Sequence, residues 1–353
     1  MILTVLGNRP QLIKSVMVSK ALQLLHIKEY IVYTYQHYNY DMYTAIVQDY
    51  NINITANEHI IEQPHSIQDY LYNIEVQIKQ LVKKIQLIIV YGDTNSTVAG
   101  ALFAKKNNLK LIHIEAGERS YNNTMPEEHN RIMVDYSSTV LCCVNSKAKS
   151  QLSNSIYKGN KIIVGDVMLD MLQYTQNQNK TASNTQLIQL LQDNKSYYYF
   201  TMHRQSNTVS YEHMHSIFAM LGKLKHTILY PMHPRVQALY SSSLLPINFV
   251  VTKPLQYNDN IIAIANANAV LTDSGGVQKE AYWLQKKCVT LRNDTEWVET
   301  LAGGWNTLYH KNTTNALIKI LKQKPDIDQW NIVQFGNGKA AKRIANVIQK
   351  LVS

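Results

Sequence analysis

Three carboxylate residues, Asp93, Glu115 and Glu127, stand at or near the ends of short apolar segments of the sequence. Like charges at close range cannot all ionise at low cost, so carboxylates that share a cleft shift one another's pKa values. Such groups can remove a proton from a carbon atom and return a proton to it. Taken singly, each would more often be a helix cap or a surface charge, so the prediction depends on all three reaching one cleft.

A second group of residues could hold phosphate. Ser274, Gly275 and Gly276 precede a predicted helix that runs to about Gln285. Two glycines leave backbone N–H groups uncovered, and a helix N-terminus carries partial positive charge, so a phosphate is favoured there. A Ser-Gly-Gly turn by itself is more often structural. Arg9 and His203, which follow other predicted strands, could add charge-assisted contacts to a diphosphate.

Several kinds of site are not supported by the sequence. No Gly-x-Gly-x-x-Gly follows the first predicted strand, which argues against a dinucleotide cofactor. No nucleophile elbow is present, which argues against a serine hydrolase. Cys142, Cys143 and Cys288 lack metal-binding spacing, and an odd, buried set of cysteines is typical of a reducing compartment. The sequence therefore gives no sign of a cysteine metal site, a dinucleotide cofactor or a serine nucleophile.

The elements that would position these groups are apolar runs rich in β-branched residues, which alternate with longer helical patterns. Continuous apolar strands joined by helices predict parallel sheets that are covered on both faces. The predicted strands are Ile2–Leu6, Tyr30–Thr34, Leu87–Tyr91, Leu111–Ile114, Thr139–Val144, Tyr197–Thr201, Thr227–Tyr230, Phe249–Val251, Ala269–Thr272 and Cys288–Leu291.

Two sheets of this kind predict two doubly wound α/β domains. We expect the first domain to span 1–167 and the second to span 168–337. A C-terminal helix within 338–353 is expected to cross back onto the first domain. Ligands of open parallel sheets bind beyond the carboxyl ends of the strands. The turns after several predicted strands carry ionisable or hydroxyl groups, and this pattern is typical of a site.

The charge balance favours a small anionic ligand. Lys and Arg number 35 against 25 Asp and Glu, which gives a formal net charge of +10. Nucleic acid binding would need this charge in a stripe, and the sequence shows only short local groups such as Lys83-Lys84. No stretch approaches the roughly 20 apolar residues of a membrane span, and the N-terminus does not have the pattern of a signal peptide. We therefore expect a cytoplasmic protein that binds neither nucleic acid nor membrane.

Ordered motifs run through nearly the whole chain. They are Gly7-Asn8-Arg9-Pro10, Gln36-His37, Gly92-Asp93-Thr94, His113-Ile114-Glu115-Ala116-Gly117, Pro126-Glu127-Glu128-His129-Asn130-Arg131, Val164-Gly165-Asp166, His203-Arg204, His233-Pro234, Asp273-Ser274-Gly275-Gly276 and Glu280-Ala281. In this order and spacing, the set resembles the motifs of the non-hydrolysing UDP-N-acetylglucosamine 2-epimerases.

The resemblance implies a GT-B-like fold, in which two Rossmann-like domains with parallel sheets face a central cleft. It also implies a homodimer that needs no metal or redox cofactor. The family removes the C2 proton of a UDP-N-acetylhexosamine and expels UDP in an anti elimination. UDP then adds back to the 2-acetamidoglucal intermediate after reprotonation on the other face. The default substrate pair is UDP-N-acetylglucosamine and UDP-N-acetylmannosamine.

The resemblance also implies residue roles. The residues at the family's catalytic positions are Asp93, Glu115, Glu127 and His203, and those at its UDP-binding positions are Arg9, Lys14, Ser274, Gly275, Gly276 and Glu280. The three acids would transfer protons, His203 would steady the departing diphosphate, and Glu280 suits the ribose hydroxyls. Additional cleft residues are expected at Arg131, Arg204, His233 and Arg292.

The sequence departs from the common family pattern at several positions. Gln11 replaces a common Glu, Trp297 replaces a common Arg, and Leu255 and Asn260 lie where some members hold the nucleotide. This pattern is similar to epimerases of modified UDP-acetamido sugars, such as UDP-2,3-diacetamido-glucuronate. UDP-6-deoxy-L-hexosamines, such as the pair UDP-N-acetyl-L-rhamnosamine and UDP-N-acetyl-L-quinovosamine, are a further alternative.

The sequence leaves other hypotheses about sites and function open. Gln36, His37 and His233 match part of an allosteric UDP-sugar site of some bacterial members, whereas Tyr38 and Asn39 depart from it. A hydrolysing epimerase would share the elimination and release free UDP. A GT-B glycosyltransferase would share the architecture, but it would not need three acids near C2.

Overall fold

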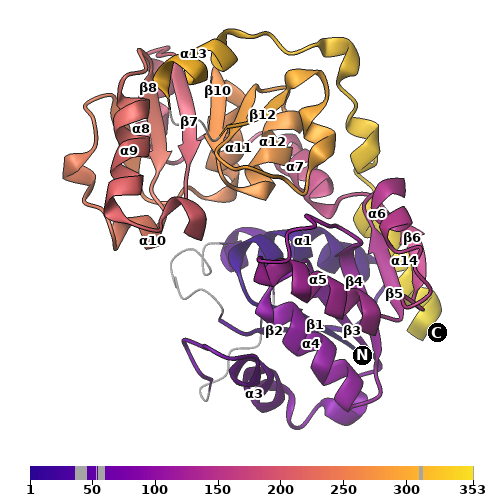
Figure 1. Ribbon diagram of the computed structural model, residues 1–353. Coiled ribbons are helices and arrows are strands. Elements are labelled where there is room, and N and C mark those ends of the chain that lie inside the picture. Colours follow the sequence, from indigo (N-terminus) through magenta and orange to yellow (C-terminus); the bar gives the residue numbers. More distant parts are fainter. Residues whose placement is uncertain (36–45, 53, 55–59, 310–312, 353) are drawn as a thin grey trace. The chain divides into compact units, whose positions relative to one another are not determined.

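The computed structural model describes residues 1–352 except 36–45, 53, 55–59 and 310–312. The chain divides into two compact units, of which the first comprises Met1–Gln173 with Ile332–Ser353 and the second Tyr174–Asn331 (Figure 1). The chain leaves the first unit after Gln173, which is later than the expected boundary between 167 and 168. It returns to the first unit at Ile332, which is earlier than the expected boundary between 337 and 338. A backbone hydrogen bond of 2.8 Å from the N–H of Asp166 to the carbonyl of Phe335 joins the two segments of the first unit.

The first unit is built on a six-stranded parallel sheet in the order β2-β1-β3-β4-β5-β6. Its strands are β1 (Ile2–Leu6), β2 (Glu29–Tyr33), β3 (Leu87–Tyr91), β4 (Lys110–Ala116), β5 (Val140–Cys143) and β6 (Asn160–Ile163). Its helices are α1 (Arg9–Leu24), α3 (Ile67–Ile78), α4 (Asn95–Lys106), α5 (Pro126–Ser137), α6 (Ser146–Gln151) and α14 (Ala340–Val352), and residues 46–50 are also helical. Helix α7 (Val167–Asn177) contains the division between the units.

The second unit has the same kind of sheet, in the order β12-β11-β10-β7-β8-β9. Its strands are β7 (Tyr197–Thr201), β8 (Thr227–Pro231), β9 (Phe249–Thr252), β10 (Ala269–Thr272), β11 (Cys288–Thr290) and β12 (Asn306–Leu308). Its helices are α8 (Thr185–Gln192), α9 (Tyr211–Gly222), α10 (Pro234–Gln237), α11 (Tyr257–Asn266), α12 (Gly275–Trp283) and α13 (Thr314–Lys322). Among the described residues, no helix combines the length and the apolar character needed to cross a membrane.

Every predicted strand is present, with small differences at the ends, and both sheets are parallel as predicted. Strands β1 and β3 are buried along their whole length, which explains their continuous apolar sequences. The prediction missed β6 and β12, which lie at the edges of the sheets. An edge strand is only partly covered, and β6 begins with the polar residues Asn160 and Lys161, so it lacks an apolar run.

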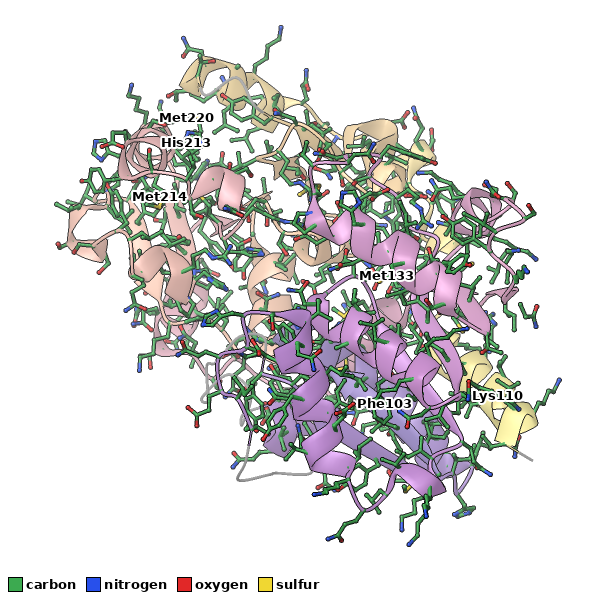
Figure 2. The ribbon with its side chains drawn as sticks, turned by 60° about the horizontal axis from the view of Figure 1, so that its bottom comes forward. Phe103, Lys110, Met133, His213, Met214 and Met220 are labelled. Atoms are coloured by element: carbon green, nitrogen blue, oxygen red, sulfur yellow. The ribbon has the colours of Figure 1, made fainter. Side chains whose placement is uncertain are left out.

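Each unit has its own apolar core. In the first unit, Phe103 of α4 is 1% exposed and belongs to a cluster with Val90 and Leu111. In the second, Met214 of α9 is equally buried and belongs to a cluster with Phe218 (Figure 2). Covering both faces of each sheet removes apolar surface from water, which is the main favourable contribution to folding.

The cysteines belong to these buried strands. Cys143 and Cys288 are fully buried, and burial raises the pKa of each thiol to about 12. Cys142 is also fully buried, and burial raises the pKa of its thiol still further. Thiols in this state are not nucleophiles at neutral pH, so they serve packing.

Helix α14 packs against α1 in the first unit. Its N-terminus is held by Asp170, whose carboxylate accepts hydrogen bonds from the N–H groups of Ala340 (3.1 Å) and Ala341 (2.8 Å). At the other end, Lys110 donates to the carbonyl of Leu351 at 2.9 Å (Figure 2). Both contacts supply partners that helix ends lack within the helix itself. The C-terminal segment is therefore a structural part of the first unit.

Candidate active site

Gln11 joins the turns that follow β1 and β3. Its side-chain oxygen accepts a hydrogen bond from the N–H of Gly7 at 2.7 Å. Its amide nitrogen donates to the carbonyl of Tyr91 at 2.6 Å and to the hydroxyl of Thr94 at 2.9 Å. A carbonyl oxygen only accepts, so this position needs a donor, which an amide supplies and an ionised glutamate does not. The amide of Gln11 therefore has a structural function in this chain.

Asp93 follows β3 and is held by helix α5. Its carboxylate pairs with the guanidinium group of Arg131, and its carbonyl accepts a hydrogen bond of 2.9 Å from the side chain of Asn130. The Asp93 side chain is 30% exposed, whereas that of Arg131 is 5% exposed. A buried arginine thus holds a carboxylate that still reaches the surface. This arrangement suits a group that must meet a ligand.

The adjacent carboxylates Glu127 and Glu128 have different surroundings in the first turn of α5. Glu128 is 1% exposed and accepts hydrogen bonds from Arg131 (2.8 Å) and from the N–H and hydroxyl of Ser120 (both 2.9 Å). Burial alone would raise the pKa of Glu128, but the bonds from Ser120 and Arg131 outweigh it and lower the pKa. Glu127 is half-buried, and its side chain makes no hydrogen bond or ion pair with the described residues. Of the two, Glu127 is the one whose carboxylate is not already engaged.

Glu115 lies at an irregular point of β4. The pairing register with β5 shifts between Ile114 and Ala116, and Glu115 has a φ of 70°. A left-handed backbone is strained for a residue with a side chain, and such strain is characteristic of functional sites. The Glu115 carboxylate pairs with the ammonium group of Lys14, and the two side chains are 11% and 15% exposed. The bulge therefore re-aims Glu115 at the strand end, where Lys14 meets it.

Lys14 also connects the two acid-bearing turns. Its ammonium nitrogen is 3.7 Å from the point where a Cβ at Gly92 would lie, immediately before Asp93. The sequence resemblance assigned Lys14 to UDP, and its partner in this structure is Glu115. Arg9, the first residue of α1, is half-buried after β1. The first unit thus carries Glu115 near the end of β4, and it carries Arg9, Lys14, Asp93, Glu127 and Arg131 on the segments that follow β1, β3 and β4.

Asp273 organises the strand-end turns of the second unit. Its buried carboxylate accepts hydrogen bonds from the N–H groups of His203 (3.0 Å) and Arg204 (2.8 Å) and from the side chain of Asn207 (3.0 Å). Its Oδ1 atom is 3.2 Å from Nδ1 of His203. Burial alone would raise the pKa of Asp273, but the charge of His203 and these hydrogen bonds hold the pKa at about 2. Asp273 is therefore a fixed anion that positions the His203–Arg204 turn.

The glycine turn at the start of α12 is crowded on one side and open on the other. Ser274 is the N-cap residue and makes no side-chain capping bond. A Cβ at Gly275 would lie 2.4 Å from Oε1 of Glu296, whereas a Cβ at Gly276 would come no closer than 4.0 Å, to the hydroxyl of Ser274. The helix N-terminus therefore has an uncovered side at Gly276, where its positive end favours an anion.

The carboxylate of Glu296, which lies beside Gly275, pairs with two arginines. Oε1 of Glu296 is 3.5 Å from Arg204, and Oε2 is 2.9 Å from Arg292. The neighbouring residue Trp297 covers the ammonium group of buried Lys279 at 3.6 Å from the ring centroid. A cation–π contact of this kind compensates a buried ammonium group. The turn therefore has the cations of Arg204 and Arg292 near it.

Two further predicted positions lie on the same unit. Glu280, on α12, is 3% exposed and accepts a hydrogen bond of 3.2 Å from Asn260. The ring of His233 stacks on that of His203, with centroids 5.2 Å apart. The second unit thus brings together His203, Arg204, His233, Ser274, Gly275, Gly276, Glu280 and Arg292 on the segments that follow β7, β8, β10 and β11. Gln36 and His37 lie outside the described residues.

Sequence reasoning missed the buried acids that organise these turns, which are Asp135 in the first unit and Asp273 as the anchor of the second. A signal for Asp135 exists in the sequence. Glu128, Arg131 and Asp135 are spaced by three and four residues, so they share a face of α5, and all three are buried. A charged face in a helix that packs on a sheet indicates a polar network rather than an apolar core contact.

Comparison with known proteins agrees with this architecture. Residues 20–349 match the family model of UDP-N-acetylglucosamine 2-epimerase. A UDP-N-acetylglucosamine 2-epimerase homolog of Methanococcus maripaludis is 36% identical over 363 residues, and the UDP-2,3-diacetamido-2,3-dideoxy-D-glucuronate 2-epimerase of Pseudomonas aeruginosa is 34% identical over 369 residues. Each match covers 99% of both proteins.

The structural comparison gives the same result. The crystal structure of Methanocaldococcus jannaschii UDP-GlcNAc 2-epimerase in complex with UDP-GlcNAc and UDP matches with a TM-score of 0.86 and 29% identity, over 99% of this chain and 100% of that chain. The predicted GT-B-like α/β class, with two doubly wound Rossmann-like units, is confirmed. Because the family model and these relatives span almost the entire sequence, the chain belongs to the UDP-N-acetylglucosamine 2-epimerase family, and it is a carbohydrate epimerase.

Proposed function

We propose that this protein inverts C2 of a UDP-N-acetylhexosamine without net hydrolysis, interconverting UDP-N-acetylglucosamine and UDP-N-acetylmannosamine. Two relatives support the choice of ligand: the Methanocaldococcus jannaschii structure contains UDP-GlcNAc and UDP, and that of the Neisseria meningitidis enzyme is bound to UDP-GlcNAc. The observation that carries the proposal is the strained, cation-paired Glu115 at a strand end, beside the turn that carries Asp93.

The proposed reaction is an elimination followed by an addition. One carboxylate of the first unit removes the C2 proton while the bond from C1 to the UDP oxygen breaks on the opposite face. A C1–C2 double bond forms, and UDP carries the electron pair away. A second acid then gives a proton to C2 from the other face, and UDP re-forms its bond to C1. The sugar loses and regains one proton, so no further reactant is consumed.

The groups of the second unit would act on the departing diphosphate. The C2 proton is poorly acidic, so the barrier depends on how well the developing charge of UDP is stabilised. The N-terminus of α12, with His203, Arg204 and Arg292 near it, supplies N–H groups and positive charge for this purpose. Glu280 would accept hydrogen bonds from the ribose hydroxyls.

A modified sugar is the second candidate substrate. The Pseudomonas aeruginosa relative, at 34% identity, is named for its action on UDP-2,3-diacetamido-2,3-dideoxy-D-glucuronate. The sequence pattern at Gln11 and Trp297 also resembles that of such enzymes. This substrate would undergo the same C2 inversion, so the two candidates differ only in the sugar that the site accepts.

The function can be tested by proton NMR in D2O with a panel of UDP-sugars, including UDP-N-acetylglucosamine, UDP-2,3-diacetamido-glucuronate and a UDP-6-deoxy-L-hexosamine. We expect one of them to give deuterium at C2 and a second epimer that retains UDP. Stoichiometric release of UDP and free sugar would instead identify a hydrolysing epimerase. Absence of exchange with every sugar, combined with transfer to an added acceptor, would identify a glycosyltransferase.

Replacing Gly276 by alanine tests the proposed diphosphate site. We expect roughly tenfold weaker UDP binding in titration calorimetry, because the added methyl group fills the open side of the turn. Folding stability should not fall, because alanine favours a helix by up to about 1 kcal/mol over glycine. Tight UDP binding by this variant would exclude α12 as the diphosphate site.

The neighbouring variant Gly275→Ala is the matched comparison. Its Cβ would meet Oε1 of Glu296 at 2.4 Å and Nε1 of Trp297 at 3.0 Å, so local packing must shift. We expect this variant to lose both thermal stability and UDP affinity. The two substitutions add the same methyl group to adjacent residues, and therefore separate an effect on the ligand from an effect on the fold.

A further inference from the structure

A buried hydrogen-bond network in the first unit links the two turns that carry Asp93 and Glu115. His113 of β4 and Asp135 of α5 are both fully buried. Nδ1 of His113 is 2.7 Å from Oδ1 of Asp135, and Nε2 of His113 is 2.7 Å from the carbonyl of Gly92. The network thus reaches the backbone immediately before Asp93.

The other oxygen of Asp135 reaches the second turn. Its Oδ2 atom accepts a hydrogen bond of 3.2 Å from the N–H of Gly117, which lies two residues after Glu115. The same oxygen is 2.7 Å from the guanidinium group of Arg119. One carboxylate therefore contacts the Glu115 turn directly and the Asp93 turn through His113.

Both turns have backbone conformations that need support. Gly92, Glu115 and Gly117 have φ values of 63°, 70° and 83°. At Gly117, a Cβ would lie 2.2 Å from the carbonyl oxygen of Ala148, so this position is restricted to glycine. Unusual backbone conformations persist only where the surroundings impose them. The contact of His113 with the carbonyl of Gly92 and the hydrogen bond from the N–H of Gly117 to Asp135 support the backbone at these positions.

The histidine ring is suited to this position because it has a nitrogen on each side. The carbonyl of Gly92 can only accept, so Nε2 carries a proton in this arrangement. The opposite nitrogen meets Asp135, and the rigid ring therefore fixes the separation between the helix and the turn. An asparagine reaches only as far as the Nδ1 position and a glutamine reaches the Nε2 position, so neither amide makes both contacts.

We propose that His113 and Asp135 are positioning residues of the epimerisation, which set the placement of the Asp93 and Glu115 carboxylates relative to each other. This inference rests on the proposed function, because it assigns the acids their proton transfers. Neither residue would touch the sugar. Catalysis by fixed acids on one carbon is sensitive to geometry, and a displacement of about 1 Å can lower the rate by about 100-fold.

The test compares His113→Asn, which retains the donor to Asp135, with His113→Gln, which retains the donor to Gly92. Tyr157→Phe is the control, because it removes the hydroxyl partner of Arg119 (3.2 Å) in the same network and leaves both contacts to the turns. Epimerisation is followed by the D2O exchange assay, UDP binding by calorimetry and folding by thermal unfolding.

We expect His113→Asn to lower kcat by roughly 100-fold with little change in KM. His113→Gln should recover part of this loss, since it restores the bond to Gly92, and UDP affinity should stay unchanged in all three variants. A purely structural role would instead lower the thermal stability of His113→Asn and His113→Gln alike and leave the kcat of their folded fraction unchanged. That result, or a kcat loss in Tyr157→Phe equal to that of His113→Asn, would overturn the inference. If the wild-type protein binds UDP but shows no C2 exchange with any sugar, the proposed function itself fails.

Discussion

Asp93→Asn and Glu127→Gln are each expected to lower epimerase turnover by roughly a thousandfold, within the 10²–10⁴-fold range of general acid–base catalysis. An amide has nearly the same shape as the carboxylate but cannot take up or release a proton at neutral pH. In Asp93→Asn the amide oxygen still accepts from Arg131, so the turn should keep its position. Initial rates of C2 epimerisation measure the loss.

The control for these variants is Glu75→Gln. Glu75 forms an exposed ion pair with Lys106 at 2.7 Å in the same unit, and exposed pairs contribute little to stability. This variant should match the wild type in turnover, and UDP affinity should be similar in all three variants. If both Asp93→Asn and Glu127→Gln kept full turnover, these carboxylates would not be the acid and base, and a glycosyltransferase would become the better hypothesis.

Asp273→Asn is expected to destabilise the second unit by about 3 kcal/mol, which is typical of breaking a buried charge pair. The carboxylate accepts from His203, Arg204 and Asn207, and an amide would turn a donor toward some of these donors. Because the His203–Arg204 turn would lose its anchor, UDP affinity should fall as well. Urea unfolding and calorimetry measure the two effects.

The contribution of Asp273 to folding stability should also depend on pH. The pKa of Asp273 is lowered from 3.8 to about 2 in the folded protein, so the unfolded chain binds more protons between these values. The stabilising contribution is therefore fully present above about pH 4 and is lost as the pH falls toward about 2. The stability difference between wild type and Asp273→Asn should narrow below about pH 4. A difference that stays constant with pH would show that the anionic form is not what stabilises the turn.

The sequence by itself determined the two sheets and the strand ends that carry the candidate site residues. Strands buried on both faces need continuous apolar residues, and this requirement is visible in β1 and β3. In parallel sheets the carboxyl ends meet at one edge, so Asp93, Glu115, His203 and Ser274 could be assigned to strand ends before the structure was known. The edge strands β6 and β12 escaped prediction because they are short and begin with polar residues, which leaves no apolar run in the sequence.

Only the tertiary structure decided which polar residues support the site and which are open to a ligand. Glu127 and Glu128 are neighbours of the same type, yet only Glu128 is engaged by Ser120 and Arg131. Gln11 bonds to Tyr91, and Asp273 to the His203–Arg204 turn, across long stretches of chain. The physical reason is that apolar burial follows local periodicity, which a sequence displays. A buried hydrogen bond instead depends on the positions of two atoms that folding brings together from distant segments.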